Sequence, residues 1–240
     1  MGDAPAAGDS LVPLSDERAA LDILTKSLFG LWDTVNSLTR LRPTKRERYR
    51  VTIFGSARVT PDHWVYGAVR DVAAELTRLG CDVVTGGGPG LMQAANEGAK
   101  LADPDGTRQK SVGIRVELPF EQEVNAFVTE AFEHKTFFTR LHHFVLVSDA
   151  FIVTPGGIGT VLETLMVWQL LQVRHLRDTP LILAGHFWDG LLDWTRAVML
   201  KPDIPLISPE DLTIPQVLPN GPAIVAAIRE HHSRWAARQH

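Results

Sequence analysis

One stretch decides the fold: Ala150-Phe151-Ile152-Val153-Thr154-Pro155-Gly156-Gly157-Ile158-Gly159-Thr160-Val161-Leu162-Glu163. Its first four residues are apolar and predict a buried strand, and residues 161–171 predict a helix. The glycine-rich turn between them aims free backbone N–H groups and the positive end of the helix dipole at one point. The stretch therefore predicts a strand–loop–helix unit with an anion site, most often one for phosphate.

Glu163 is the unusual residue of this stretch, because it is an acidic residue close to a predicted anion site. It lies four residues after Gly159. Helical side chains lean toward the N-terminus, so its carboxylate is expected to reach back to the mouth of the loop. Close to the positive end of the helix, it is expected to stay ionised. A carboxylate does not help an anion to bind, so Glu163 is expected to have another role.

Strands and helices alternate on both sides of this stretch. The alternation predicts βαβ units, a parallel sheet and a doubly wound, Rossmann-like α/β fold with helices on both faces. Strands are expected at residues 50–54, 81–84, 111–114, 150–154 and 180–183, with a further short strand within 125–132. Helices are expected at residues 62–79, from 91 through 99, and at 135–147, 161–171, 188–200 and 223–237.

The N-terminal part differs in composition from this core. Residues 1–13 are small and polar and predict disorder, and leucines then recur at helical spacing from Ser15 to about Arg40. A basic run, residues 40–50, follows this helix and indicates a solvated connector rather than a nucleic-acid patch, since no aromatic platform accompanies it. We therefore expect an extension over residues 1–48, comprising a disordered start, an amphipathic helix and the connector, and a single nucleotide-binding domain over residues 49–240.

Composition excludes several classes of protein. The 240 residues are 45% hydrophobic and carry a net charge of 24 − 28 = −4, which favours neither nucleic acid nor an anionic membrane. Cys81 is the single cysteine, so no internal disulfide forms, and no apolar run is long enough for a membrane helix. The adjacent histidine pairs 142–143 and 231–232 are poor chelates, so no metal is expected. A soluble cytoplasmic protein is expected.

Three strands end in loops of small residues, and ligands of open α/β sheets bind beyond the carboxyl ends of the strands. The loops lack the Lys-Ser/Thr pair of a Walker motif and the spacing of a dinucleotide fingerprint, so a nucleoside monophosphate fits better. The candidate nucleotide-binding residues are Gly55, Ser56, Gly86, Gly87, Gly88, Gly90, Met92, Pro155, Gly156, Gly157, Ile158, Gly159 and Thr160.

Two of these motifs, residues 86–92 and 155–163, with Ser148-Asp149-Ala150 before the second, resemble the Lonely guy (LOG) family. Its members are cytokinin riboside 5′-monophosphate phosphoribohydrolases, formerly mislabelled lysine decarboxylases. The resemblance implies cleavage of an adenine nucleotide to the free base and ribose 5-phosphate, without a cofactor. It places the catalytic carboxylate on Glu163 and the catalytic arginine on Arg140.

The chain departs from the family pattern at Leu141, where the family has lysine, and at Phe144, where it has methionine. These departures leave the identity of the base and any prenyl-group pocket open. Two other functions also stay open: a non-catalytic nucleotide or molybdenum-cofactor carrier of the same fold, and a transferase that moves deoxyribose between bases. A homodimer or larger homo-oligomer is expected, with the helices of Arg140 and Glu163 near the interface.

Overall fold

The computed structural model describes residues 16–38, 47–117, 124–201 and 203–238. The chain divides into two units, residues 1–44 and 45–240, and each is described by itself. In the first unit, helix α1 covers Glu17–Leu38. Its leucines at positions 21, 24, 28 and 31 are more than half exposed, so the helix expected from their spacing is confirmed and presents an apolar stripe.

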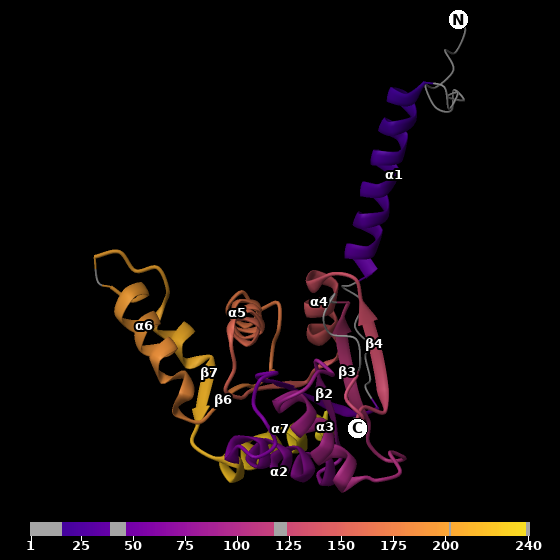
Figure 1. Ribbon diagram of the computed structural model, residues 1–240. Helices are drawn as coiled ribbons and strands as arrows, with labels where there is room; N and C mark the ends of the chain where they lie inside the picture. The colour runs from indigo at the N-terminus through magenta and orange to yellow at the C-terminus, as the bar shows by residue number, and fades with distance from the viewer. Residues whose placement is uncertain (1–15, 39–46, 118–123, 202, 239–240) are drawn as a thin grey trace, which may run out of the picture. The chain divides into compact units, whose positions relative to one another are not determined.

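The second unit is built on one parallel sheet of seven strands (Figure 1). The strand order β4-β3-β2-β1-β5-β6-β7 places β1 at the centre. Strands β2 to β4 are added on one side of β1 and strands β5 to β7 on the other, so the strand order reverses between β1 and β5, although all strands are parallel. Such a reversal is the point at which doubly wound folds bind ligands. The strands are β1 Tyr49–Phe54, β2 Cys81–Thr85, β3 Ser111–Val116, β4 Glu130–His134, β5 Ala150–Val153, β6 Leu181–Ala184 and β7 Pro215–Leu218.

Helices cover both faces of this sheet, which confirms the predicted fold class. In Figure 1, α2, α3 and α7 lie below the sheet, and α4, α5 and α6 lie above it. The α-helices are α2 Trp64–Arg78, α3 Leu91–Ala102, α4 Phe137–Val147, α5 Ile158–Gln172, α6 Asp189–Met199 and α7 Gly221–Ala237. Two short 3₁₀ helices, His186–Trp188 and Pro209–Thr213, flank α6 and precede β7.

Alternation along the strands divides the core into two apolar clusters. Val51 and Ile53 of β1 pack with α2, α3 and α7, whereas Phe54 packs with α4, α5 and α6. Successive strand side chains point to opposite faces, so each face is filled from one set of helices. Cys81 is fully buried in the first cluster, as expected of a strand-entry core residue.

Both edge strands differ from expectation. The strand expected within residues 125–132 begins at Glu130 and ends at His134, and its first four residues are exposed. β7 was not predicted at all, because it is four residues long and begins with Pro215. Proline lacks the N–H that a central strand needs and is tolerated at an edge.

The described part of the basic run, Arg48 and Arg50, has a structural role. Both guanidinium groups pair with Asp82 Oδ atoms, at 3.5 Å and 3.4 Å, and the Asp82 side chain is fully buried. The remaining basic residues, Arg40, Arg42, Lys45 and Arg46, lie outside the described residues. Over the ranges described, none of the helices is both long and apolar enough to cross a bilayer.

Candidate active site

A pocket of ≈ 460 Å³ lies where β1, β2, β3 and β5 end. The three small-residue loops, Arg140 and Glu163 all line this pocket. The predicted residues that line it are Gly55, Ser56, Gly86, Met92, Gly157, Ile158, Gly159, Thr160, Arg140 and Glu163. The carboxylate of Glu163 thus reaches back toward the loop, as its place in the first turns of α5 predicts.

Glu163 and Arg140 form a buried ion pair in this pocket. Arg140 Nη1 donates to Glu163 Oε1 at 3.2 Å, and the two side chains are 12% and 10% exposed. Arg140 Nε donates to the carbonyl oxygen of Ile114 at 2.9 Å, and the guanidinium lies 5.1 Å from the ring centre of Phe144. Three contacts therefore hold Arg140 against the carboxylate, one of them a cation–π contact.

Burial changes the protonation that the helix dipole alone predicts for Glu163. Burial raises the pKa of Glu163 to about 7, although the charge of Arg140 and its hydrogen bond act to lower it. Removal from water disfavours the ionised form, and one buried arginine compensates only in part. Burial therefore opposes the ionised form that the helix dipole favours, and Arg140 acts to restore it.

The first turn of α5 is open toward the pocket. Gly157 is the N-cap, no side chain caps the helix, and a Cβ atom at Gly157 or Gly159 would meet nothing within 4 Å. A Cβ at Gly156 would instead collide with the Thr160 side chain, so this glycine allows the loop to close on the helix. Uncapped N–H groups at a helix N-terminus suit a phosphate or carboxylate.

Gly86 makes room for the Arg140 side chain. A Cβ atom there would collide with the Arg140 guanidinium and lie 2.7 Å from Met92 Sδ. The loop that follows is shaped by Gly87 and Gly90, which have left-handed φ values of 71° and 69°. Glycine adopts this conformation without the steric cost that a side chain adds.

Five of the predicted binding residues do not line the pocket: Gly87, Gly88, Gly90, Pro155 and Gly156. Two of them, Pro155 and Gly90, connect the loops of the pocket instead. Ser56 N donates to the Pro155 carbonyl oxygen at 3.1 Å, and Gly90 leaves space for the Ser56 carbonyl oxygen. Their direct contact with a ligand stays a prediction.

Three polar or aromatic pocket residues were not identified from the sequence: Arg58, Arg115 and Phe137. Arg58 follows the first small-residue loop, and Arg115 lies near the end of β3. The position of Arg58, three residues after Gly55 at the end of a strand, could have indicated a ligand contact. A single arginine, however, forms no sequence motif that would distinguish it from other surface arginines. Arg115 lies 4.0 Å from the Glu133 carboxylate of the neighbouring strand β4.

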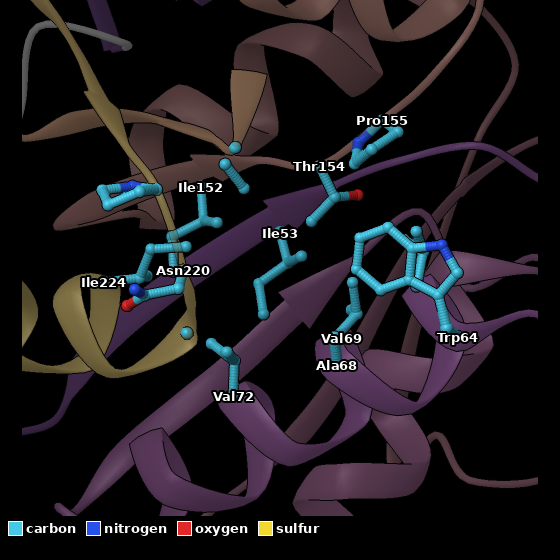
Figure 2. Close-up of a pocket in the computed structure, with 15 residues that line it drawn as sticks. Ile53, Trp64, Ala68, Val69, Val72, Ile152, Thr154, Pro155, Asn220 and Ile224 are labelled. Atoms are coloured by element: carbon cyan, nitrogen blue, oxygen red, sulfur yellow. The ribbon is translucent and has the colours of Figure 1, made fainter. Parts of the chain in front are cut away.

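A second hollow, of ≈ 210 Å³, lies between the sheet and helices α2 and α7 (Figure 2). Figure 2 shows Ile53, Val69, Ile152 and other apolar side chains around it. Its polar side chains are already engaged, because Thr154 donates to the Phe54 carbonyl oxygen and Asn220 accepts from Ala223 N. None of the residues that line the hollow is an acid, a histidine or a charged group, so the pocket that contains Glu163 is the candidate active site.

Taken together, the sheet order, the open helix terminus and the buried ion pair define a class. The second unit is a doubly wound α/β domain in which an uncapped, glycine-rich helix N-terminus lies beside a carboxylate–guanidinium pair at the switch point. In the parts of the chain that the structure describes, no cluster of three or more histidine, cysteine, aspartate or glutamate residues is arranged to hold a metal.

The chain belongs to the family described as "possible lysine decarboxylase", whose model matches residues 92–228. This confirms the resemblance to the LOG family. The chain is 26% identical over 194 residues to cytokinin riboside 5′-monophosphate phosphoribohydrolase LOG2 of Arabidopsis thaliana, a match that covers 80% of this chain and 87% of the relative.

A second relative is longer than this chain. The pyrimidine/purine nucleotide 5′-monophosphate nucleosidase of Escherichia coli is 29% identical over 140 residues, which cover 56% of this chain. The match spans only 30% of that relative's length. Among solved structures, a molybdenum cofactor carrier protein of Chlamydomonas reinhardtii aligns with a TM-score of 0.58 at 15% identity, over 78% of this chain and 99% of the carrier. That likeness shows the fold alone.

Proposed function

We propose that this chain hydrolyses the N-glycosidic bond of nucleoside 5′-monophosphates, with adenosine 5′-monophosphate and its N6-modified forms as substrates. The products are the free base and ribose 5-phosphate. The observation that carries the proposal is the buried Glu163–Arg140 pair beside an uncapped helix terminus in one pocket. The names of both relatives describe this class of reaction on nucleotide monophosphates.

The reaction breaks the bond between C1′ of the ribose and the base nitrogen. The base leaves with the electron pair and takes up a proton, and water supplies the hydroxyl group that remains on C1′. Positive charge develops on C1′ and the ring oxygen as the base departs, so a fixed carboxylate next to the ribose stabilises the transition state. Glu163, in its ionised form, is assigned this role and the orientation of the attacking water.

Arg140 acts on Glu163 and on the departing base. Its charge opposes the effect of burial on the Glu163 pKa, so it raises the ionised fraction at neutral pH. Arg140 also lines the pocket, and a guanidinium group there is assigned the stabilisation of negative charge on the leaving group. The N-terminal turn of α5, with Gly157, Gly159 and Thr160, is assigned to the phosphate.

Lysine decarboxylation, which the family description suggests, does not fit the pocket. Pyridoxal phosphate chemistry uses a lysine that forms a Schiff base. None of the described residues that line the pocket is a lysine, and Lys135, close in sequence to Arg140, is exposed outside it. The pocket supplies a carboxylate and arginines instead.

Incubation of the full chain with AMP and isopentenyl-AMP, followed by chromatography for the free base, tests the proposal. We expect release of base and of ribose 5-phosphate in equal amounts, and release slowed about 10²-fold or more in the Glu163→Gln variant. Tight binding without release would instead favour the carrier alternative. Transfer of the sugar to an added second base, in place of hydrolysis, would favour the transferase.

The proposal includes an assembly and a compartment. We propose that the protein is a homodimer or larger homo-oligomer, since Ile158, Leu162 and Leu165 follow one face of α5 and are 86%, 48% and 45% exposed. Phe138 of α4 is 81% exposed close to the same pocket. We also propose a cytoplasmic location, where a reducing environment suits the single buried thiol of Cys81.

A further inference from the structure

We infer that Arg58 is the cation that binds the substrate phosphate, and that it makes the site selective for 5′-phosphorylated ligands over nucleosides. This inference rests on the proposed function and deepens it. Neither the motifs nor the family resemblance assigns a role to Arg58. Three observations support the assignment: the engagement of the other arginines, the position of Arg58 and the charge of the phosphate.

The other two arginines of the pocket already have partners. Arg140 is bound to Glu163 and to the Ile114 carbonyl oxygen, at 3.2 Å and 2.9 Å. Arg115 lies 4.0 Å from the Glu133 carboxylate. Arg58 also lines the pocket, it is exposed, and among the described residues no carboxylate lies within ion-pair distance of it.

The Arg58 backbone is connected to the phosphate loop. Ser56 N donates to the Pro155 carbonyl oxygen at 3.1 Å, which joins the loop after β1 to the loop before α5. Ser56 Oγ in turn accepts from Arg58 N at 3.0 Å. Because β1 and β5 are adjacent strands, the loop that carries Arg58 lies next to the loop that leads into α5. Arg115 starts from β3, two strands further along the sheet from β1.

A backbone cradle alone does not neutralise a phosphate. The phosphate of a monoester carries a charge of about −1.5 to −2 at neutral pH, whereas a helix N-terminus supplies roughly half a positive charge. A guanidinium group presents a planar pair of donors that matches two phosphate oxygens. Arg58 supplies this charge from the loop after β1, whereas Arg140 stays in contact with Glu163.

Calorimetric titration of Arg58→Gln with AMP, ribose 5-phosphate and adenosine tests the inference. We expect affinity for both phosphorylated ligands to fall about 10- to 100-fold, the loss typical of a charged hydrogen bond, and affinity for adenosine to change less than about twofold. Arg58→Lys is expected to recover part of the loss, because it keeps the charge without the paired donors. The matched control is Arg78→Gln, which removes an exposed arginine that pairs with Glu75 on α2.

Two results would overturn the inference: an equal loss for adenosine and AMP, or unchanged binding of ribose 5-phosphate in a variant that melts at the wild-type temperature. Base release by the wild-type protein, measured separately, tests the proposed function. If Arg58→Gln still releases base and binds phosphate with unchanged affinity, only the role assigned to Arg58 is refuted. Phosphate binding that depends on Arg58, without any base release by the wild-type protein, would refute only the proposed hydrolysis.

Discussion

At Glu163 two requirements oppose one another. Stabilising the transition state requires a charged carboxylate in a site shielded from water, but the shielding itself raises the pKa of Glu163 to about 7. Arg140 resolves the conflict in part by holding the carboxylate at 3.2 Å. If Glu163 acts in its ionised form, activity is expected to depend on pH through this pair.

Replacing Glu163 with glutamine separates binding from turnover. Glu163→Gln keeps the shape of the side chain and removes its charge, so we expect AMP affinity to change little and turnover to fall about 10²-fold or more. Single-turnover release of base, together with calorimetry, measures both quantities. Glu130→Gln, an exposed carboxylate at the start of β4, is the matched control. Wild-type turnover in Glu163→Gln would refute the catalytic role.

The pH dependence of kcat/KM is expected to show an acidic limb near pH 7, because the ionised form of Glu163 is the active one. In Arg140→Gln the opposing charge is lost, so the limb is expected to move to higher pH, in addition to any fall in rate. An unchanged limb in this variant would show that another group titrates. Values of kcat/KM measured from pH 5 to 9 for the wild type and Arg140→Gln show whether the limb moves.

Stability is expected to depend on the same group. The pKa of Glu163 is raised from 4.5 to about 7 on folding. Its contribution is therefore fully present below pH 4.5 and is lost as the pH rises through about 7. Urea unfolding at pH 5 and pH 8 is expected to show a smaller loss of stability over this range in Glu163→Gln than in the wild type. Equal losses would contradict the assigned shift.

At the level of elements, the N-terminus of α5 combines an open surface with a tightly packed one. Gly157 has room for a side chain on the pocket side, whereas Gly156 packs directly on Thr160. Substitutions at these two adjacent glycines are therefore expected to have different effects. A substitution at Gly157 tests the ligand site, and one at Gly156 tests the closure of the loop.

Gly157→Val is expected to weaken AMP binding far more than adenosine binding, because the added side chain enters the space assigned to the phosphate. Thr160→Val is expected to act in the same direction by removing a hydroxyl donor. Gly190→Ala in α6 is the control, since its Cβ atom also meets nothing within 4 Å and it lies outside this pocket. Calorimetry with both ligands measures the difference. Equal losses for the two ligands would show that the loop has another function.

The elements also show how far the sequence alone predicts this structure. Central strands such as Ala150–Val153 are buried on both faces and appear as continuous apolar runs, so they were predictable. The edge strands β4 and β7 depend on a single neighbouring strand, and their own residues are exposed or begin with proline. The local sequence therefore indicates β4 only in part and β7 not at all.

The candidate site was predictable to a similar extent. The glycine-rich motif and the resemblance point to Glu163 and Arg140. These residues are 23 positions apart in the sequence and lie on different helices, so only the fold shows the geometry of their contact. The raised pKa of Glu163 is likewise a property of burial, which no motif encodes. Arg58 and Arg115 reach the pocket because the parallel sheet brings the ends of β1 and β3 to the same edge.

At the level of the whole molecule, each unit has an exposed apolar face. In the first unit, the α1 leucines at positions 21, 24, 28 and 31 are 63–67% exposed. In the second, Leu162 and Leu165 lie on α5 near the candidate site. Uncovered apolar stripes of this kind mark protein–protein contacts, so a second copy of the chain is the expected partner.

Light scattering on the full chain is expected to give a mass at least twice 26.5 kDa at micromolar concentration. If α5 forms the interface, a glutamate at both Leu162 and Leu165 is expected to reduce the mass to that of one chain, because two charges would be buried without partners. Leu101→Glu, which alters another exposed leucine on α3, is the control. Removal of residues 1–42 tests α1 in the same way: a monomer after truncation, with an intact oligomer in the α5 variant, would assign the interface to the N-terminal helix. A mass of 26.5 kDa for the unaltered chain would refute the oligomer.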